Sequence, residues 1–206
     1  MSDITLIHGF ATGLNVSIFR TARGPEAGFY GFRNLIERGI AKPFRWDERE
    51  NVSFWKSLLP MTYITVYERE REKVRSETTL TALDTFLRDE QPRVVVCHSM
   101  GCALFLSFLT RNELPASVRH VVFIQADVPR DAALPASANA AWHNLYCPWD
   151  PTLFASALYH RTWRAGLTGL RDARATNRLT PLFGGWNLHT VSISDPKIAA
   201  WTATLA

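Results

Sequence analysis

Residues 94–102 read Val-Val-Val-Cys-His-Ser-Met-Gly-Cys, an apolar and β-branched run that leads through a serine into an apolar helical segment. This order predicts a nucleophile elbow, in which a serine occupies a sharp turn between a strand and a helix. At such a turn the serine oxygen points away from the sheet, and the helix N-terminus directs its positive dipole at any oxyanion that forms there. Ser99 is therefore the candidate nucleophile.

The glycine pattern around Ser99 matches the Gly-x-Ser-x-Gly signature in part. Cys97 occupies the first glycine position, whereas Gly101 occupies the second. Small residues are needed there because the turn is strained and neighbouring backbones approach it closely. Cysteine is small enough to be tolerated at this position. The alternative interpretation of residues 94–102 is a buried strand followed by an ordinary loop serine.

Length and composition predict a single domain that spans residues 1–206. Hydrophobic residues make up 47% of the 206 residues, which is enough for one sizeable core. The 23 Lys and Arg against 19 Asp and Glu give a net charge of +4, and the signs alternate, as in residues 68–73, Glu-Arg-Glu-Arg-Glu-Lys. Alternating charge is typical of a solvated helix face, so no nucleic-acid partner is expected. No apolar run reaches the roughly 20 residues of a membrane span.

The three cysteines, Cys97, Cys102 and Cys147, lie in apolar runs and do not suggest a disulfide framework. The first residues show neither the basic nor the apolar region of a secretory signal, so the cytoplasm is the expected location. Cysteine and histidine spacings fit none of the usual zinc patterns, and we expect neither a metal nor a cofactor. The sequence indicates no particular oligomeric state.

Apolar strands and amphipathic helices alternate along the chain, which is typical of an α/β protein with a mainly parallel sheet and helices on both faces. Strands are expected at residues 4–7, 93–97, 118–125 and 142–147, and helices at 29–38, 69–89, 100–110 and 152–163. A further strand is expected at either 43–46 or 62–67.

Two motifs together resemble the α/β-hydrolase superfamily, specifically small lipase- and esterase-like members without a large cap. An early strand leads into His8-Gly9-Phe10, and about 90 residues later another strand leads into His98-Ser99-Met100-Gly101. The resemblance implies an α/β-hydrolase fold over most of the chain. It also implies an oxyanion hole formed by the backbone N–H groups of Phe10 and Met100.

The same resemblance implies that an acid and then a histidine follow the serine along the chain. Asp150, in the segment Tyr-Cys-Pro-Trp-Asp-Pro at 146–151, stands where the superfamily places the acid, and Asp127 is the second choice. A turn residue before Pro151 is the alternative interpretation of Asp150, because aspartate favours turns.

His189 is the expected base, since the other histidine beyond Asp150, His160, falls in an expected helix. If residues 179–183 form the last strand, His189 ends the glycine-containing loop 184–189, and a closing helix starts near Pro196. If residues 190–194 form that strand instead, His189 precedes it and no histidine follows. The first arrangement is favoured.

These residues predict a serine hydrolase that acts on a carboxylic ester or similar small acyl substrate through an acyl-enzyme. The alternatives are a non-catalytic binding protein of the same fold and an acyltransferase with the same triad. Four tryptophans of the C-terminal part suggest an apolar or aromatic acyl group, with filling of a core as the alternative interpretation: Trp142, Trp149, Trp163 and Trp186. Residues 11–30 and 47–65 are the longest irregular stretches and are expected to border the pocket or form a partial lid.

Overall fold

The structure is a computed structural model that describes residues 2–9, 26–46, 60–136, 139–180 and 188–206. Its described residues form a six-stranded sheet in the order β2-β1-β3-β4-β5-β6, with every neighbouring pair parallel. The strands are β1 (Ile4–Ile7), β2 (Ala41–Phe44), β3 (Val94–His98), β4 (His120–Ile124), β5 (Ala141–Tyr146) and β6 (Ala175–Leu179). The expected α/β-hydrolase fold class is confirmed.

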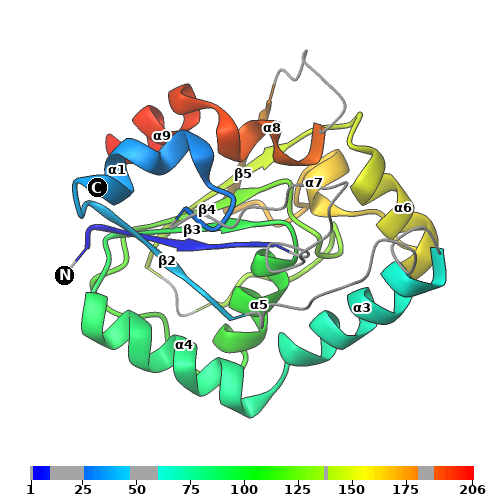
Figure 1. Cartoon of the computed structure of the whole chain (residues 1–206), viewed down its shortest axis with the longest axis horizontal. Helices are drawn as coiled ribbons and strands as arrows, with labels where there is room; N and C mark the ends of the chain where they lie inside the picture. Colours follow the sequence, from blue (N-terminus) through cyan, green and yellow to red (C-terminus); the bar gives the residue numbers. More distant parts are fainter. Residues whose placement is uncertain (1, 10–25, 47–59, 137–138, 181–187) are drawn as a thin grey trace.

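Helices cover both faces of this sheet. They are η1 (Tyr30–Phe32), α1 (Arg33–Glu37), α3 (Pro60–Lys73), α4 (Glu77–Glu90), α5 (Met100–Leu109), α6 (Pro151–His160), α7 (Ala165–Thr168), α8 (Leu188–Ser194) and α9 (Pro196–Ala203). Figure 1 shows α1, α8 and α9 above the sheet and α4 and α5 below it. A parallel sheet needs this double cover because both of its faces are apolar.

Strand β3 shows how the sequence produces this layering. All five of its residues are buried. Val96 packs in the cluster that contains Phe32 of η1, whereas its neighbour Val95 packs in the cluster that contains Phe105 of α5. Successive side chains of a strand point to opposite faces, so an unbroken apolar run supplies both cores at once.

The segment between β2 and β3 differs from the expected elements. The expected helix 69–89 is two helices, α3 and α4, because Ser76 caps the second one by accepting the N–H of Thr79 at 3.3 Å. The alternative strand at 62–67 is wrong, since these residues are helical, and β2 lies two residues before the expected 43–46. The β-branched residues at 62–67 favour a strand, but they continue into the charged part of α3. There, i,i+3 ion pairs such as Arg71 with Glu68 at 3.1 Å stabilise the helix.

The end of the chain also corrects one expectation. The last strand in the described residues, β6, ends at Leu179, where the expected strand 179–183 begins, and 181–183 lie outside the described residues. The alternative strand 190–194 is wrong, because these residues belong to α8. The closing helix α9 begins at Pro196 as expected, with the Asp195 side chain accepting the N–H of Lys197 at 2.8 Å.

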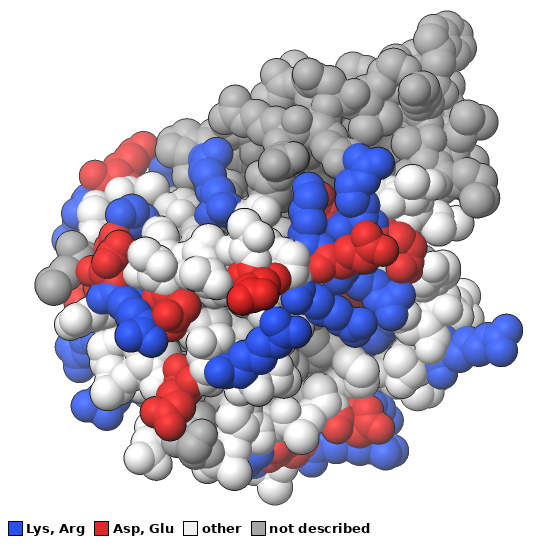
Figure 2. Space-filling model, turned by 90° about the horizontal axis from the view of Figure 1, so that it is seen from below, with Lys and Arg blue, Asp and Glu red and all other residues white. Residues whose placement is uncertain are grey.

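The face formed by α3 and α4 carries both signs of charge. Figure 2 shows Lys and Arg side chains interleaved with Asp and Glu on this side of the molecule. On α4, for example, Arg88 pairs with Asp84 at 2.8 Å. Across the helices that the structure describes, none combines the length and the apolar character needed to cross a membrane.

Candidate active site

Ser99 lies on the turn between β3 and α5. Its φ of 53° and ψ of −122° are unusual for a residue other than glycine and place its backbone in a strained region. Two backbone hydrogen bonds hold the turn against the end of β4: the Ser99 N–H donates to Ile124 O at 3.0 Å, and the Asp127 N–H donates to Ser99 O at 3.1 Å. The strand-turn-helix geometry expected of an elbow is therefore present.

Two glycines allow the elbow to pack directly on the end of β1. A Cβ atom on Gly101 would lie 2.5 Å from the carbonyl oxygens of Ile7 and His8, and one on Gly9 would lie 2.7 Å from the Ser99 Cβ. Real Cβ atoms are not found so close to other heavy atoms. The second glycine of the signature is therefore a steric requirement of this packing.

Cys97, at the first glycine position, is accommodated because its side chain points into the core. The Cys102 thiol donates to the Cys97 carbonyl oxygen at 3.3 Å, so the two cysteines are part of the packing beneath the elbow. Burial raises the pKa of both thiols well above the ordinary value. A thiol that stays protonated is a poor nucleophile, so neither cysteine is a good candidate for a reactive group at this turn.

The His189 side chain, from the first turn of α8, lies between Ser99 and Asp150. Its Nδ1 is 2.6 Å from Asp150 Oδ2, and its Nε2 is 2.7 Å from Ser99 Oγ. Because an ionised carboxylate can only accept hydrogen bonds, Nδ1 carries the proton and Nε2 is free to accept the Ser99 hydroxyl proton. The structure thus brings together the three side chains that the sequence singled out, with His189 in a helix and not in the expected loop.

Asp150 is fully buried and accepts four hydrogen bonds. As the N-cap of α6 it accepts the N–H groups of Thr152 at 2.9 Å and Leu153 at 3.1 Å through Oδ1. Its Oδ2 accepts from His189 and from the Gln125 amide nitrogen, both at 2.6 Å. Burial alone would raise its pKa, but His189 and the hydrogen bonds outweigh burial and hold the pKa of Asp150 below its ordinary value. Asp150 is therefore ionised at neutral pH.

His98 supports His189 from the side of β3. Its Nε2 donates to the His189 carbonyl oxygen at 2.8 Å, and the two ring centroids are 4.8 Å apart. Burial, followed by the proximity of His189, lowers the pKa of His98 to about 3, so its ring is neutral. The sequence predicted no role for His98 or Gln125. The feature that could have pointed to them is a polar residue at or directly after the end of an apolar strand.

Asp127, the second choice for the acid, belongs to a different cluster. Its Oδ1 accepts from Ser156 Oγ at 2.6 Å and lies 3.1 Å from Arg164 Nε, and its Oδ2 accepts from the Tyr67 hydroxyl at 3.0 Å. The Tyr67 hydroxyl also lies 2.7 Å from His160 Nε2. This cluster joins α3 and α6 to the end of β4, so the Asp127 carboxylate is engaged away from His189.

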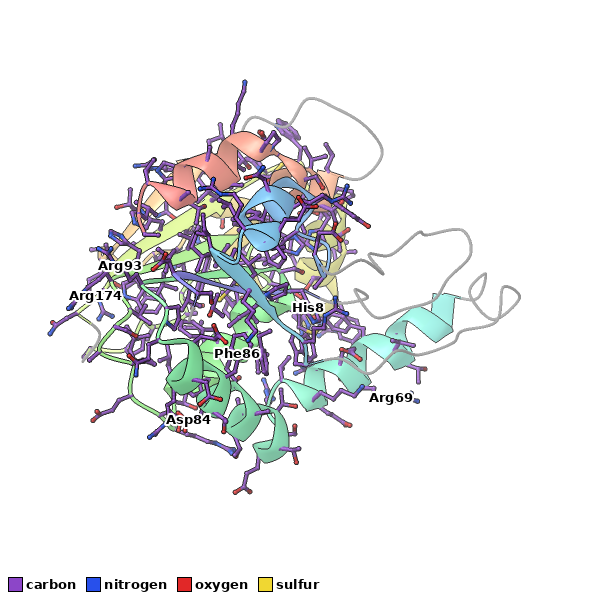
Figure 3. All side chains as sticks on the ribbon, turned by 60° about the vertical axis from the view of Figure 1, so that its left-hand side comes forward. His8, Arg69, Asp84, Phe86, Arg93 and Arg174 are labelled. Carbon is purple, nitrogen blue, oxygen red and sulfur yellow. The ribbon has the colours of Figure 1, made fainter. Side chains whose placement is uncertain are left out.

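The described site gathers at the carboxyl ends of the strands, where parallel sheets place their ligands. Figure 3 shows His8, which follows β1, at the opposite end of the strands from Arg93 and Arg174, which precede β3 and β6. Trp46 stacks on the His8 ring at 5.3 Å and donates to the His8 carbonyl oxygen at 3.1 Å.

Of the expected oxyanion donors, Met100 is the first residue of α5, so its N–H has no acceptor within that helix. Phe10 lies outside the described residues. Most of the expected lid, 11–30 and 47–65, also lies outside them; residues 26–30 form a turn that enters η1, and 60–65 begin α3.

The tryptophans expected near the site are divided. Trp142 is buried and packs on Phe123 with ring centroids 5.7 Å apart, in agreement with the alternative that the tryptophans fill a core. Trp149, which is 78% exposed, directly precedes Asp150, and Trp163 is also exposed. Trp186 lies outside the described residues. Among the side chains that the structure describes, no three of His, Cys, Asp or Glu gather as metal ligands would.

Comparison with known proteins identifies one family. A family model described as serine hydrolase matches residues 46–156, more than half of the chain. The matched range contains Ser99, Asp127 and Asp150 and ends before His189. No curated protein matches the chain.

Proposed function

Because this chain belongs to the serine hydrolase family, within the α/β-hydrolase superfamily, we propose that it hydrolyses small carboxylic esters with Ser99 as nucleophile, His189 as base and Asp150 as acid. One observation carries the proposal: hydrogen bonds of 2.6 and 2.7 Å join Asp150 to His189 and His189 to Ser99. Both distances lie within the reach that proton transfer requires.

In the proposed reaction, Ser99 Oγ attacks the ester carbonyl carbon while His189 Nε2 takes the hydroxyl proton. Asp150 stays ionised and stabilises the imidazolium that forms. Collapse of the tetrahedral intermediate breaks the bond to the alcohol, which leaves with the proton from His189. A water molecule then gives a proton to His189 and attacks the acyl carbonyl carbon. When this second tetrahedral intermediate collapses, Ser99 Oγ leaves with the proton from His189 and the carboxylic acid is released.

The oxyanion of the tetrahedral intermediate would be held by backbone donors. Met100 directly follows Ser99 and is the first residue of α5, which supports its N–H as one donor to this charge. We propose the Phe10 N–H as the second donor, following the resemblance of the His8-Gly9-Phe10 segment to the superfamily. Such preformed donors need no reorganisation as the charge forms.

As part of the same proposal, the chain acts as a single domain in the cytoplasm on a small acyl substrate. The three cysteines are free and buried, which fits a reducing compartment.

Hydrolysis of p-nitrophenyl acetate tests the proposal. We expect the wild type to release p-nitrophenol catalytically and Ser99→Ala to be inactive, while Ser107→Ala, on the same helix, keeps wild-type turnover. Turnover by Ser99→Ala, or a wild type that releases no p-nitrophenol, would contradict the proposal; an inactive wild type would favour a binding protein. If added alcohol diverts the acyl group to a new ester more efficiently than water, the protein is an acyltransferase.

A further inference from the structure

Gln125 occupies a special place directly after β4. It is fully buried, and its φ of 47° is unusual for a residue other than glycine. Its amide nitrogen lies 2.6 Å from Asp150 Oδ2 and 2.8 Å from the carbonyl oxygen of Leu188. Both partners can only accept hydrogen bonds, so the NH₂ group of the amide faces them and uses both of its hydrogens.

One acceptor is the Asp150 carboxylate, and the other is a carbonyl oxygen of α8, the helix that carries His189. Proton transfer requires that these two parts of the site keep their relative positions. Asp150 orients the His189 ring, and Leu188 is the residue that precedes His189 in α8. A single amide group thus ties the carboxylate of the acid to the backbone of the base. Gln125 and His189 also share the same carboxylate oxygen, so the position of Gln125 limits where the His189 ring can lie.

We propose that Gln125 is a positioning residue that holds Asp150 and His189 in the geometry needed for proton transfer from Ser99. The inference rests on the proposed function. Gln125 has no exposed surface, so it acts through Asp150 and Leu188 without touching the substrate. Its loss should therefore affect kcat far more than KM, since small misplacements of a reacting group cost about 100-fold in rate.

The first test is Gln125→Leu, which keeps approximate volume and removes the amide. We expect kcat for p-nitrophenyl acetate to fall about 10- to 100-fold, with KM changed less than about threefold. Gln91→Leu is a matched control, because Gln91 also has a positive φ, of 46°, but is exposed. It precedes β3 and so lies at the other end of that strand from Ser99. Its kcat and KM should equal those of the wild type.

A double-mutant cycle with Asp150→Asn separates positioning from a structural role. If Gln125 acts through Asp150, Gln125→Leu should lower kcat much less in the Asp150→Asn background than in the wild type. A merely structural role predicts losses that multiply in full. Thermal unfolding of each variant shows that the comparison is made on folded protein.

Gln125→Glu keeps the shape of the side chain and tests the inference if the leucine variant does not fold. The new carboxyl would lie beside the Asp150 carboxylate, and two such groups cannot readily both ionise. When protonated, it still donates one hydrogen bond; when ionised, it repels Asp150. We therefore expect the ratio of Gln125→Glu activity to wild-type activity to fall as pH rises from about 6 to 9, whereas a structural role predicts a flat ratio.

Activity of the wild type shows whether a negative result concerns Gln125 alone or the proposed function as a whole. If the wild type hydrolyses the ester through Ser99, unchanged kcat in Gln125→Leu, fully multiplicative losses in the cycle, or a flat pH ratio would overturn the inference alone. A wild type that does not hydrolyse the ester would overturn the proposed function, and the inference would fall with it.

Discussion

The Nε2 atom of His189 lies 2.7 Å from the Oγ atom of Ser99, although 90 positions separate the two residues in the chain. Ser99 reaches this point on the turn after β3, and His189 reaches it from the first turn of α8. Figure 1 shows that α8 lies above the sheet whereas α5, which follows Ser99, lies below it. The candidate site therefore forms where elements from both layers meet the carboxyl ends of the strands.

Replacing Asp150 with Asn should lower kcat by about 10³- to 10⁴-fold, because the amide favours the wrong tautomer of His189. The fold should persist, since asparagine also caps helices well. Asp195→Asn is the matched control, because Asp195 likewise caps a helix and precedes a proline. Steady-state hydrolysis of p-nitrophenyl acetate measures both variants. Comparable losses in the two would mean that capping, not orientation of His189, explains the effect.

Replacing Asp127 with Asn should affect stability more than catalysis. Asp127 and Arg164 are both buried and 3.1 Å apart, so the substitution leaves the arginine charge without its partner. Loss of one partner from a buried pair typically costs about 3–5 kcal/mol of unfolding free energy. Urea unfolding should show this loss, while kcat per folded molecule stays within about tenfold of the wild type. A severe loss of kcat without loss of stability would move the acid to Asp127.

His98 should make folding stability depend on acid pH. Burial, followed by His189, lowers its pKa from 6.5 to about 3 in the folded protein. Between these values the unfolded chain binds a proton that the folded chain does not, so stability falls as pH falls through this window. The contribution has a slope of up to about 1.4 kcal/mol per pH unit.

His98→Gln tests this dependence because glutamine does not titrate and can still donate to the His189 carbonyl. Urea unfolding between pH 7 and pH 3.5 should show a shallower loss of stability in the variant than in the wild type. Parallel curves for the two proteins would contradict a neutral, buried His98.

Replacing Gly101 with Ala should destabilise the elbow. The added methyl group would lie 2.5 Å from two backbone carbonyl oxygens of β1 and the following residue, which cannot move as a flexible side chain could. Overpacking of this kind typically costs about 1–3 kcal/mol. We expect a lower urea midpoint together with reduced kcat, since Ser99 is two residues away. Ser107→Ala, in the same helix, should change neither the urea midpoint nor kcat. A Gly101→Ala variant with the urea midpoint and kcat of the wild type would show that the packing at this point is loose.

The sequence predicted the elements whose physical cause is local. The apolar run before Ser99 became β3 because it can be buried on both faces, and the strands of the sheet core lie close to their expected positions. The segment 62–67 was ambiguous, because its β-branched residues favour a strand while the charged residues after it favour a helix. In the folded chain the helix prevails.

Contacts between distant segments could not be derived from spacing. The hydrogen bonds from Gln125 to Leu188 and from His98 to His189 join residues 63 and 91 positions apart. Local patterns give each of these residues a strand end or a helix start and say nothing about its partner. For the same reason the sequence left Asp127 and Asp150 as alternatives, because spacing along the chain does not show which side chains surround each carboxylate.

Covalent labelling with a fluorophosphonate, mapped by mass spectrometry, tests the assignment of Ser99 as a nucleophile activated by His189. We expect that one equivalent modifies Ser99 in the wild type, that Ser99→Ala is not labelled, and that His189→Ala reacts orders of magnitude more slowly because the three residues act as a unit. Labelling that persists in Ser99→Ala or maps to another residue, or a wild-type rate in His189→Ala, would contradict it.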